Sequence, residues 1–189
     1  MRGLRLRVRH ILLLTGIVAV GFGVVLAYSA VNADRARTDA RRSISTLGAL
    51  DLSVLEQLNQ VRLKAGLVAL QTSPALSASA AQHSTEMVID GYFSHNSRNG
   101  TVFWKRLLHY YPLIGSDAWS VGENMLWTSG GLTAVHAVAL WMASPEHRAN
   151  VMNPRWRQIG ISALQRSNAP GTFDGRTVIV IVTDFGVRN

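Results

Sequence analysis

The sequence is organised around ten residues, Trp141-Met142-Ala143-Ser144-Pro145-Glu146-His147-Arg148-Ala149-Asn150, in which an apolar segment ends at a proline. Pro145 has no backbone N–H and a fixed φ, so we expect one helix to end near Ser144 and another to begin there. Ser144 is then the expected N-cap, and Glu146 suits the positive end of the helix dipole. These residues alone fit both a capped helix start with a solvated His–Arg pair and a functional histidine at His147.

Two further motifs favour the functional interpretation. The first is Tyr92-Phe93-Ser94-His95, which follows an expected helix, and the second is Val121-Gly122-Glu123-Asn124. The order Phe-Ser-His, Gly-Glu-Asn, Trp-x-x-Ser-Pro-x-His-Arg-x-Asn resembles the CAP superfamily (SCP-like proteins: cysteine-rich secretory, antigen 5 and pathogenesis-related-1). The Ser-Pro-x-His-Arg form resembles the branch common in bacteria. The resemblance covers residues 50–189.

The resemblance implies a site. In this family two histidines and two acidic residues line a shallow cleft, and three of these positions correspond to His95, Glu123 and His147. The fourth position, an acidic residue in the family, is Ser144 here, so the tetrad is incomplete. Glu146 is a weaker candidate, because its side chain at that position is expected to point toward solvent.

The same residues define the candidate chemistry. Neutral imidazole and carboxylate are good zinc ligands, and two His with one Glu leave a coordination position open for water. The expected site for Zn or another divalent metal therefore consists of His95, His147 and Glu123. His95 and His147 lie 52 residues apart, so only the fold can join them. Glu123 is also the one candidate general base, and no catalytic residue is assigned beyond it.

Composition limits the classes of partner. The chain has 189 residues, 48% of them hydrophobic, and a net charge of +8. It contains no cysteine, which excludes disulfides, Cys-ligated metals and thiol nucleophiles. Residues 1–50 carry eight Arg against two Asp, so most of the positive charge lies at the N-terminus. The remainder has no interleaved basic and aromatic pattern, and we therefore expect no nucleic-acid partner.

The N-terminal residues predict a membrane segment. A basic tail, 1–10, precedes an uncharged apolar run, 11–31, which is long enough to span a bilayer as a signal-anchor helix. The expected tail is cytoplasmic, residues 32–49 form a basic linker, and the domain 50–189 lies outside the membrane. The alternative is secretion after signal cleavage near Ala33, although cleavable apolar regions are usually about 7–15 residues long.

The pattern over 50–189 predicts an α+β domain. Helices are expected from Ser53, where Ser53 and Glu56 form a capping-box pattern, and from Ser73-Pro74 to Gly91. Further helices are expected near 101–110 and 132–142, an edge strand over 125–127, and two strands over 158–164 and 177–185. This order suggests a three-layer α–β–α sandwich with a small antiparallel sheet.

Three functions follow from these observations. The first is a membrane-tethered, extracytoplasmic CAP-type module without enzymatic activity, which binds a lipid or protein ligand at the His/Glu cleft. The second is a metal-dependent peptide or ester hydrolase that uses His95, His147 and Glu123. The third is a purely structural His–Glu cluster. We favour the first, since family members share the cleft but differ in role.

Overall fold

The computed structural model describes residues 27–39, 44–113, 115 and 118–188, in two units that divide between Arg42 and Ser43. In the first unit, residues 27–39 are helical and exposed. The expected tail 1–10 and residues 11–26 of the expected anchor lie outside the described residues. Within the described ranges, no helix combines the length and the apolar character needed to cross a bilayer. The anchor therefore stays a prediction.

The second unit begins earlier than the sequence indicates. Strand β1 (Ile44–Thr46) pairs with β4 (Gln158–Ala169), and helix α2 begins at Gly48. The expected basic linker over 32–49 therefore includes helical residues up to 39, strand β1 and the start of α2. The physical reason is backbone pairing, since β1 covers part of the outer edge of β4.

One mixed sheet forms the centre of this unit. Its strand order is β1-β4-β5-β3, where β3 is Trp119–Thr128 and β5 is Arg176–Arg188. These pairings are antiparallel, but the short β2 (Gln71–Thr72) pairs with β4 in parallel. The expected strands were placed correctly but are longer than predicted. The antiparallel sheet expected from the sequence is present, with the two-residue β2 as its one parallel addition among the described strands.

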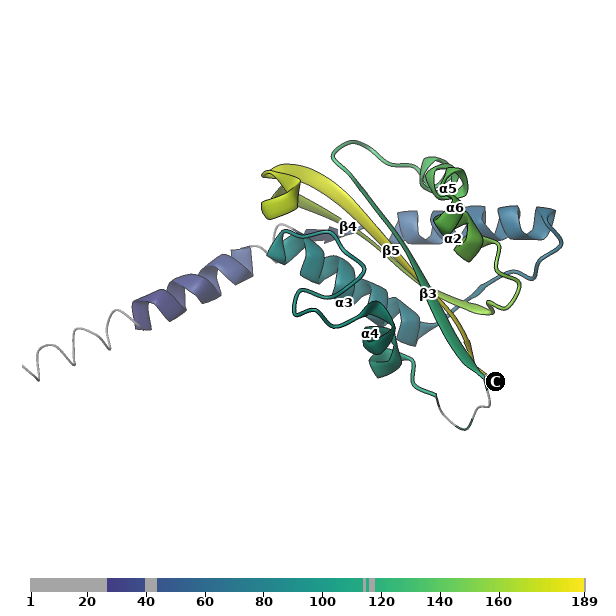
Figure 1. Ribbon diagram of the computed structural model, residues 1–189. Helices are drawn as coiled ribbons and strands as arrows, with labels where there is room; N and C mark the ends of the chain where they lie inside the picture. The colour runs from purple at the N-terminus through teal and green to yellow at the C-terminus, as the bar shows by residue number, and fades with distance from the viewer. Residues whose placement is uncertain (1–26, 40–43, 114, 116–117, 189) are drawn as a thin grey trace, which may run out of the picture. The chain divides into compact units, whose positions relative to one another are not determined.

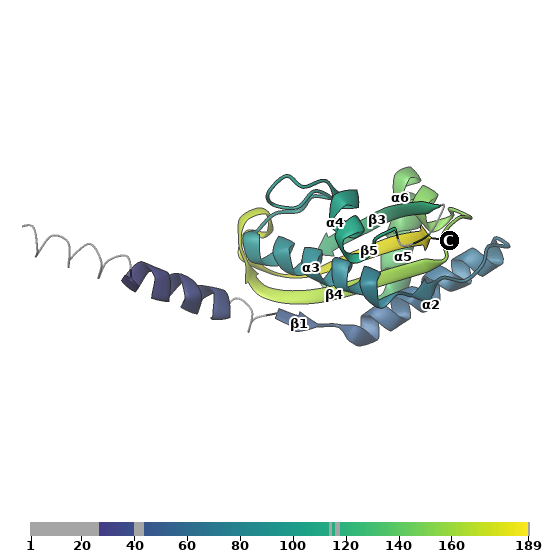
Figure 2. The same ribbon diagram turned by 90° about the horizontal axis from the view of Figure 1, so that it is seen from below.

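Helices cover both faces of the sheet (Figures 1 and 2). Helices α2 (Gly48–Lys64), α5 (Ala134–Ala143) and α6 (Pro145–Val151) pack on one face. Helices α3 (Pro74–Asp90) and α4 (Phe103–Tyr110) pack on the other, and a 3₁₀ turn (Gly171–Phe173) joins β4 to β5. The mixed α/β architecture expected from the sequence is therefore present.

The helix caps expected from the sequence are present in part. Ser73 caps α3 through its hydroxyl, and Gly91 ends that helix in the left-handed conformation, as predicted. The predicted capping box at Ser53 was wrong, because α2 begins at Gly48 and the Ser53 hydroxyl donates to the Ala49 carbonyl inside the helix. Ser144 occupies the N-cap position of α6 as expected, but its side chain makes no capping hydrogen bond.

Close packing of α3 on the sheet depends on a glycine. A Cβ at Gly160 of β4 would collide with the backbone of Leu76 and Ser77 at the start of α3. Only glycine therefore permits this approach of helix to strand. The contact fixes α3, and with it the loop that follows Gly91 and carries His95.

Candidate functional site

The two polar side chains of the Gly-Glu-Asn motif, Glu123 and Asn124, point from strand β3 to opposite faces of the sheet. Successive side chains of a strand alternate in direction, so Glu123 points toward α4 and Asn124 toward α6. Both residues are buried. The motif lies within β3, rather than between a loop and a short strand as expected.

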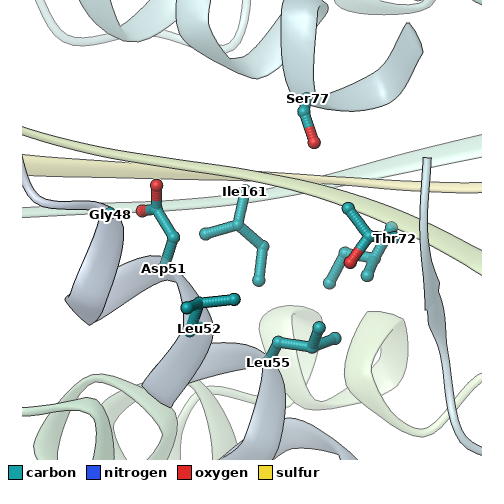
Figure 3. Close-up of a pocket in the computed structure, with 8 residues that line it drawn as sticks. Gly48, Asp51, Leu52, Leu55, Thr72, Ser77 and Ile161 are labelled. Carbon is teal, nitrogen blue, oxygen red and sulfur yellow. The ribbon is translucent and has the colours of Figure 1, made fainter. Parts of the chain in front are cut away.

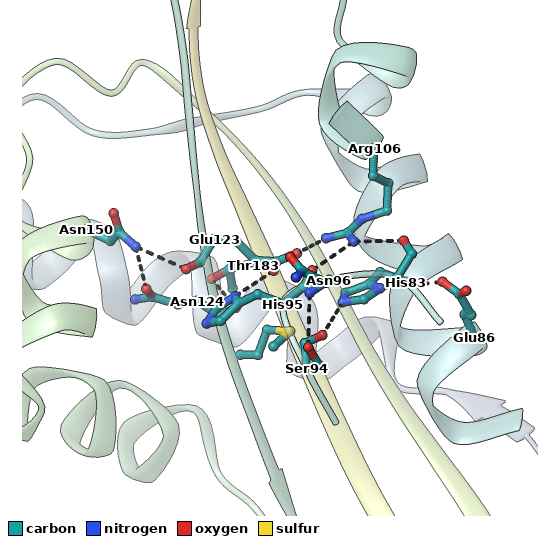
Figure 4. Close-up of polar contacts among 12 residues, drawn as sticks. His83, Glu86, Ser94, His95, Asn96, Arg106, Glu123, Asn124, Asn150 and Thr183 are labelled. Carbon is teal, nitrogen blue, oxygen red and sulfur yellow. Dashed lines mark hydrogen bonds and ion pairs between the residues drawn. The ribbon is translucent and has the colours of Figure 1, made fainter. Parts of the chain in front are cut away.

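A chain of contacts links Glu123 to the surface (Figure 4). Its Oε2 forms an ion pair with Nη2 of Arg106, and its Oε1 accepts from Nδ1 of His95 at 2.7 Å. The Glu123 and Arg106 side chains are only 1% and 3% exposed, whereas that of His95 is 46% exposed. Since a carboxylate only accepts, Nδ1 of His95 carries the proton and Nε2 is left for an external partner.

The loop that carries His95 is fixed from both sides. Nε2 of His83, on α3, donates to the Ser94 carbonyl at 2.9 Å. Nη1 of Arg106, on α4, donates to the His95 carbonyl at 3.1 Å and to the Ser97 hydroxyl at 3.3 Å. Because both the backbone and the ring of His95 are held, its exposed nitrogen has a defined position.

The asparagines of the two motifs join β3 to α6, the helix that carries His147. Nδ2 of Asn124 donates to the His147 carbonyl at 3.0 Å. Nδ2 of Asn150 donates to Oδ1 of Asn124 at 2.9 Å and to the Glu123 carbonyl at 3.0 Å. A Cβ at Gly122 would meet the Asn150 side chain at 2.9 Å, which explains the glycine before Glu123. These motif residues act structurally.

His147 lies near the same edge of β3. Burial lowers its pKa below the ordinary value of 6.5, the positive charge of His95 lowers it further, and Glu146 acts in the opposite direction. The structure joins His95 to Glu123 directly, and the side chain of Asn124, at the neighbouring position of β3, binds the backbone of His147. No hydrogen bond among the described residues links either of the remaining candidates to this cluster: Ser144 is half-buried and Glu146 is exposed.

The donor set does not fit the expected metal site in this arrangement. Both oxygens of Glu123 are engaged, one by a guanidinium, so the carboxylate orients His95 instead of facing a cation. Two imidazoles remain, fewer than the three protein ligands typical of catalytic zinc. Within the described part of the chain, no group of three or more His, Cys, Asp or Glu side chains could hold a metal ion.

Three buried groups behind Glu123 were missed. Arg106 and His83 contact the site as described above, although His83 was given no role from the sequence. Asp184 of β5 is directly opposite Glu123 in the sheet register. Burial raises the pKa of Asp184 well above its usual value, and the neighbouring Glu123 charge adds to this effect. A signal did exist for Asp184, since this acidic residue closely follows the apolar run 178–182 of the same strand.

A polar pocket adjoins the far side of Arg106. It has a volume of about 320 Å³ and lies between α3 and α4. The residues around it include Glu86, Ser97, Asn99, Lys105, Arg106 and His109. The histidines and the glutamate of the candidate site do not line it, so it is a separate hollow that shares one buried guanidinium with the site.

Comparison with known proteins places these features in context. A family model described as CAP, the cysteine-rich secretory protein family, matches residues 55–183. The chain is 33% identical over 122 residues to "Uncharacterized protein YkwD" of Bacillus subtilis (strain 168). That match covers 64% of this chain and 45% of YkwD, so the chain spans less than half of that relative's length.

Solved structures share the fold. An extracellular protein containing a SCP domain from Bacillus anthracis str. Ames has a TM-score of 0.56 at 22% identity, over 73% of this chain and 40% of that one. An outer surface protein from Borrelia burgdorferi has a TM-score of 0.57 at 20% identity, over 72% of this chain and 90% of that one. At such identities the likeness concerns the fold alone.

Proposed function

This chain belongs to the CAP family of cysteine-rich secretory proteins, and we propose that it is a non-enzymatic, extracytoplasmic binding module. Two relatives of the same fold are described as an extracellular and an outer surface protein, which supports a location outside the cytoplasm. The apolar run 11–31 would tether the module to the cell membrane, with cleavage near Ala33 as the alternative.

One observation carries this proposal: both oxygens of the Glu123 carboxylate are occupied inside the protein. A general base must reach the water or hydroxyl that it deprotonates, and a side chain that is 1% exposed cannot do so. Glu123 is therefore a positioning residue for His95. This argues against the hydrolase mechanism in which Glu123 activates water.

The ligand would meet the two imidazoles. Nδ1 of His95 is engaged by Glu123, which leaves Nε2 for a ligand, and burial lowers the pKa of His147, which favours its neutral form. Glu123 and Arg106 neutralise one another beneath them. Such a surface suits hydrogen bonding to a lipid headgroup or to a protein surface. A divalent metal held by the two imidazoles, with further ligands from the bound molecule, is the second candidate ligand.

The test compares the full chain with a His95→Asn/His147→Asn double variant. The asparagine introduced at position 95 can still donate from its amide to Glu123, so the fold is retained while both outward nitrogens are removed. Lipid extraction with mass spectrometry, and calorimetric titration with ZnCl₂ and with phosphatidylglycerol vesicles, are applied to both proteins. We expect the wild type alone to retain a lipid or to bind a probe with saturation.

Two results would change the conclusion. Equal binding of every probe by both proteins would remove the imidazole surface as the ligand site. Cleavage of a peptide or ester by the wild type, sensitive to a chelator and lost in the double variant, would replace the binding module by the metal-dependent hydrolase.

A further inference from the structure

The outer edge of β4 pairs with other strands in two places. The stretch around Ile161 lies between these pairings and is called the interval. Strand β1 pairs with β4 over 164–166, and β2 pairs with Gln158 and Ile159. Just outside these ladders, the Ala163 carbonyl accepts from Leu47 N at 2.9 Å, and the Ile159 carbonyl accepts from Ser73 N at 2.8 Å. The backbones of residues 159 and 163 therefore face outward, and alternation along the strand makes the backbone of Ile161 do the same.

Ile161 lies in the unpaired stretch of this edge. No hydrogen bond to its outward N–H or C=O is found among the described residues. Its neighbours Gly160 and Ser162 face β5, where they oppose Asp184 and Val182. Ile161 is only partly buried, so the interval is open to solvent. A free donor and acceptor on one edge residue form a template for another strand.

A pocket lies directly over this interval (Figure 3). Its volume is about 270 Å³. Leu52 and Leu55 form an apolar wall on the α2 side, whereas the Ser77 hydroxyl lies on the α3 side and Thr72 of β2 lines one end. The two walls therefore differ, as do the two faces of an extended chain whose side chains alternate.

Asp51 gives the pocket its charge. Its Oδ1 accepts from Ala163 N at 2.6 Å and so takes the place of a carbonyl on a neighbouring strand. Asp51 is the one ionisable residue in the lining, and in the described residues its Oδ2 has no hydrogen-bond partner. This carboxylate favours a neutral or basic occupant and disfavours a fatty acid or another anion.

We propose that this interval is a docking site for a neutral or basic extended peptide segment of a partner protein, which pairs with Ile161 and places an apolar side chain against Leu52 and Leu55. Residues 159 and 163 are about 13 Å apart along the strand, room for two or three peptide residues. The residue opposite Ile161 would make both backbone bonds, the mode known as β-strand addition. The interval lies on β4, away from the edge strand β3 that carries Glu123, so the proposal is independent of the imidazole site.

The test uses the full chain and a blocked peptide of three residues, acetyl-Lys-Leu-Lys-methylamide. Its matched control carries an N-methyl group on the leucine, which removes the donor for the Ile161 carbonyl. Amide NMR is expected to show saturable shifts at Ile161 and Ala163, with hydrogen exchange of the Ile161 N–H slowed about tenfold or more. The methylated peptide should bind about tenfold more weakly, the cost of roughly one hydrogen bond.

Two variants separate docking from unspecific contact. Leu52→Lys alters a side chain that is 70% exposed, so it should fold, and it should weaken the peptide about tenfold by repelling its lysines. Leu140→Lys, at another exposed leucine outside the pocket, should leave binding unchanged. The proposal is overturned if millimolar peptide produces no saturable shift, if the methylated peptide binds equally well, or if the free chain already protects the Ile161 N–H.

Discussion

The Arg106 guanidinium and the Glu123 carboxylate form an ion pair that is buried on both sides, and it joins α4 to β3. Arg106 also donates to the backbone of His95, while Glu123 accepts from the ring of the same residue. Two buried charges thus hold one half-exposed imidazole at its backbone and at its ring. A charge pair of this kind fixes geometry more than it adds stability.

Arg106→Met should destabilise the domain strongly. The substitution leaves Glu123 buried without its counter-charge, which typically costs about 3–5 kcal/mol. The free energy of unfolding in urea measures this. Arg176→Met is the matched control, because Arg176 pairs with Asp174 at the surface, where such pairs contribute about 0–1 kcal/mol. If both variants lost the same free energy of unfolding, this would contradict the burial of the Arg106–Glu123 pair.

His95→Ala and His95→Asn should differ in stability. Alanine leaves Oε1 of Glu123 without its donor, and we expect a loss of about 1 kcal/mol. Asparagine can supply an N–H near the position of Nδ1, so its loss should be smaller. Thermal unfolding of the three proteins gives the comparison. If both variants melt at the same temperature, the hydrogen bond between residue 95 and Glu123 does not account for the stability that His95 contributes.

His83→Gln should make the domain less sensitive to acid. Burial lowers the pKa of His83 below 6.5, an effect that Arg106 reinforces and that Glu123, the Ser94 carbonyl and Glu86 oppose. Below pH 6.5 the unfolded chain therefore binds a proton that the folded chain resists, and stability falls as pH drops. Glutamine can donate to the Ser94 carbonyl without titrating.

The measurement for His83 is the free energy of unfolding at pH 7 and at pH 5. The wild type should lose more between these values than His83→Gln. His136→Gln, at an exposed position on α5, is the control and should follow the wild type. A wild-type pH dependence in His83→Gln would show that another group causes the acid sensitivity.

Asp51→Asn should stabilise the domain increasingly as pH rises. Burial raises the pKa of Asp51 from 3.8 to about 6, although its hydrogen bond from Ala163 acts against this. Ionisation of Asp51 therefore opposes folding above pH 6, and the penalty disappears at pH 4. One pKa unit corresponds to about 1.4 kcal/mol, and solvent access reduces the effect, so we expect a gain of roughly 1 kcal/mol at pH 8.

Urea unfolding of Asp51→Asn and the wild type at pH 4 and pH 8 tests this prediction. The asparagine oxygen can still accept from the Ala163 N–H, so the hydrogen bond is not a confounding change. A difference between the two proteins that is the same at both pH values would contradict the assignment of the raised pKa to Asp51.

Sequence periodicity predicted much of the fold because local signals agreed with packing. The Ser73 cap, the Gly91 end of α3 and the break at Pro145 were predicted correctly. The failures were at pairings between distant segments. Strands β1 and β2 are too short to have a pattern of their own, and they exist because β4 offers them an edge.

The site was predictable only in part for the same reason. Three motifs pointed to His95, Glu123 and His147, and in the structure His95 contacts Glu123 while Asn124 binds the His147 backbone. The role of Glu123 could not be predicted, since it depends on Arg106, which belongs to no motif. His83 was dismissed because a histidine on an alanine-rich helix has many ordinary explanations, and its contact with Ser94 becomes evident only when the helix and the loop are placed.

The most direct test of the account is the tautomer of His95, measured by long-range ¹H–¹⁵N NMR on the full chain at a pH where the ring is neutral. We predict a proton on Nδ1, donated to Glu123, and an unprotonated Nε2 that faces solvent. A ring protonated on Nε2, or a mixture of tautomers like that of a free histidine, would contradict the role of Glu123 as the residue that positions His95.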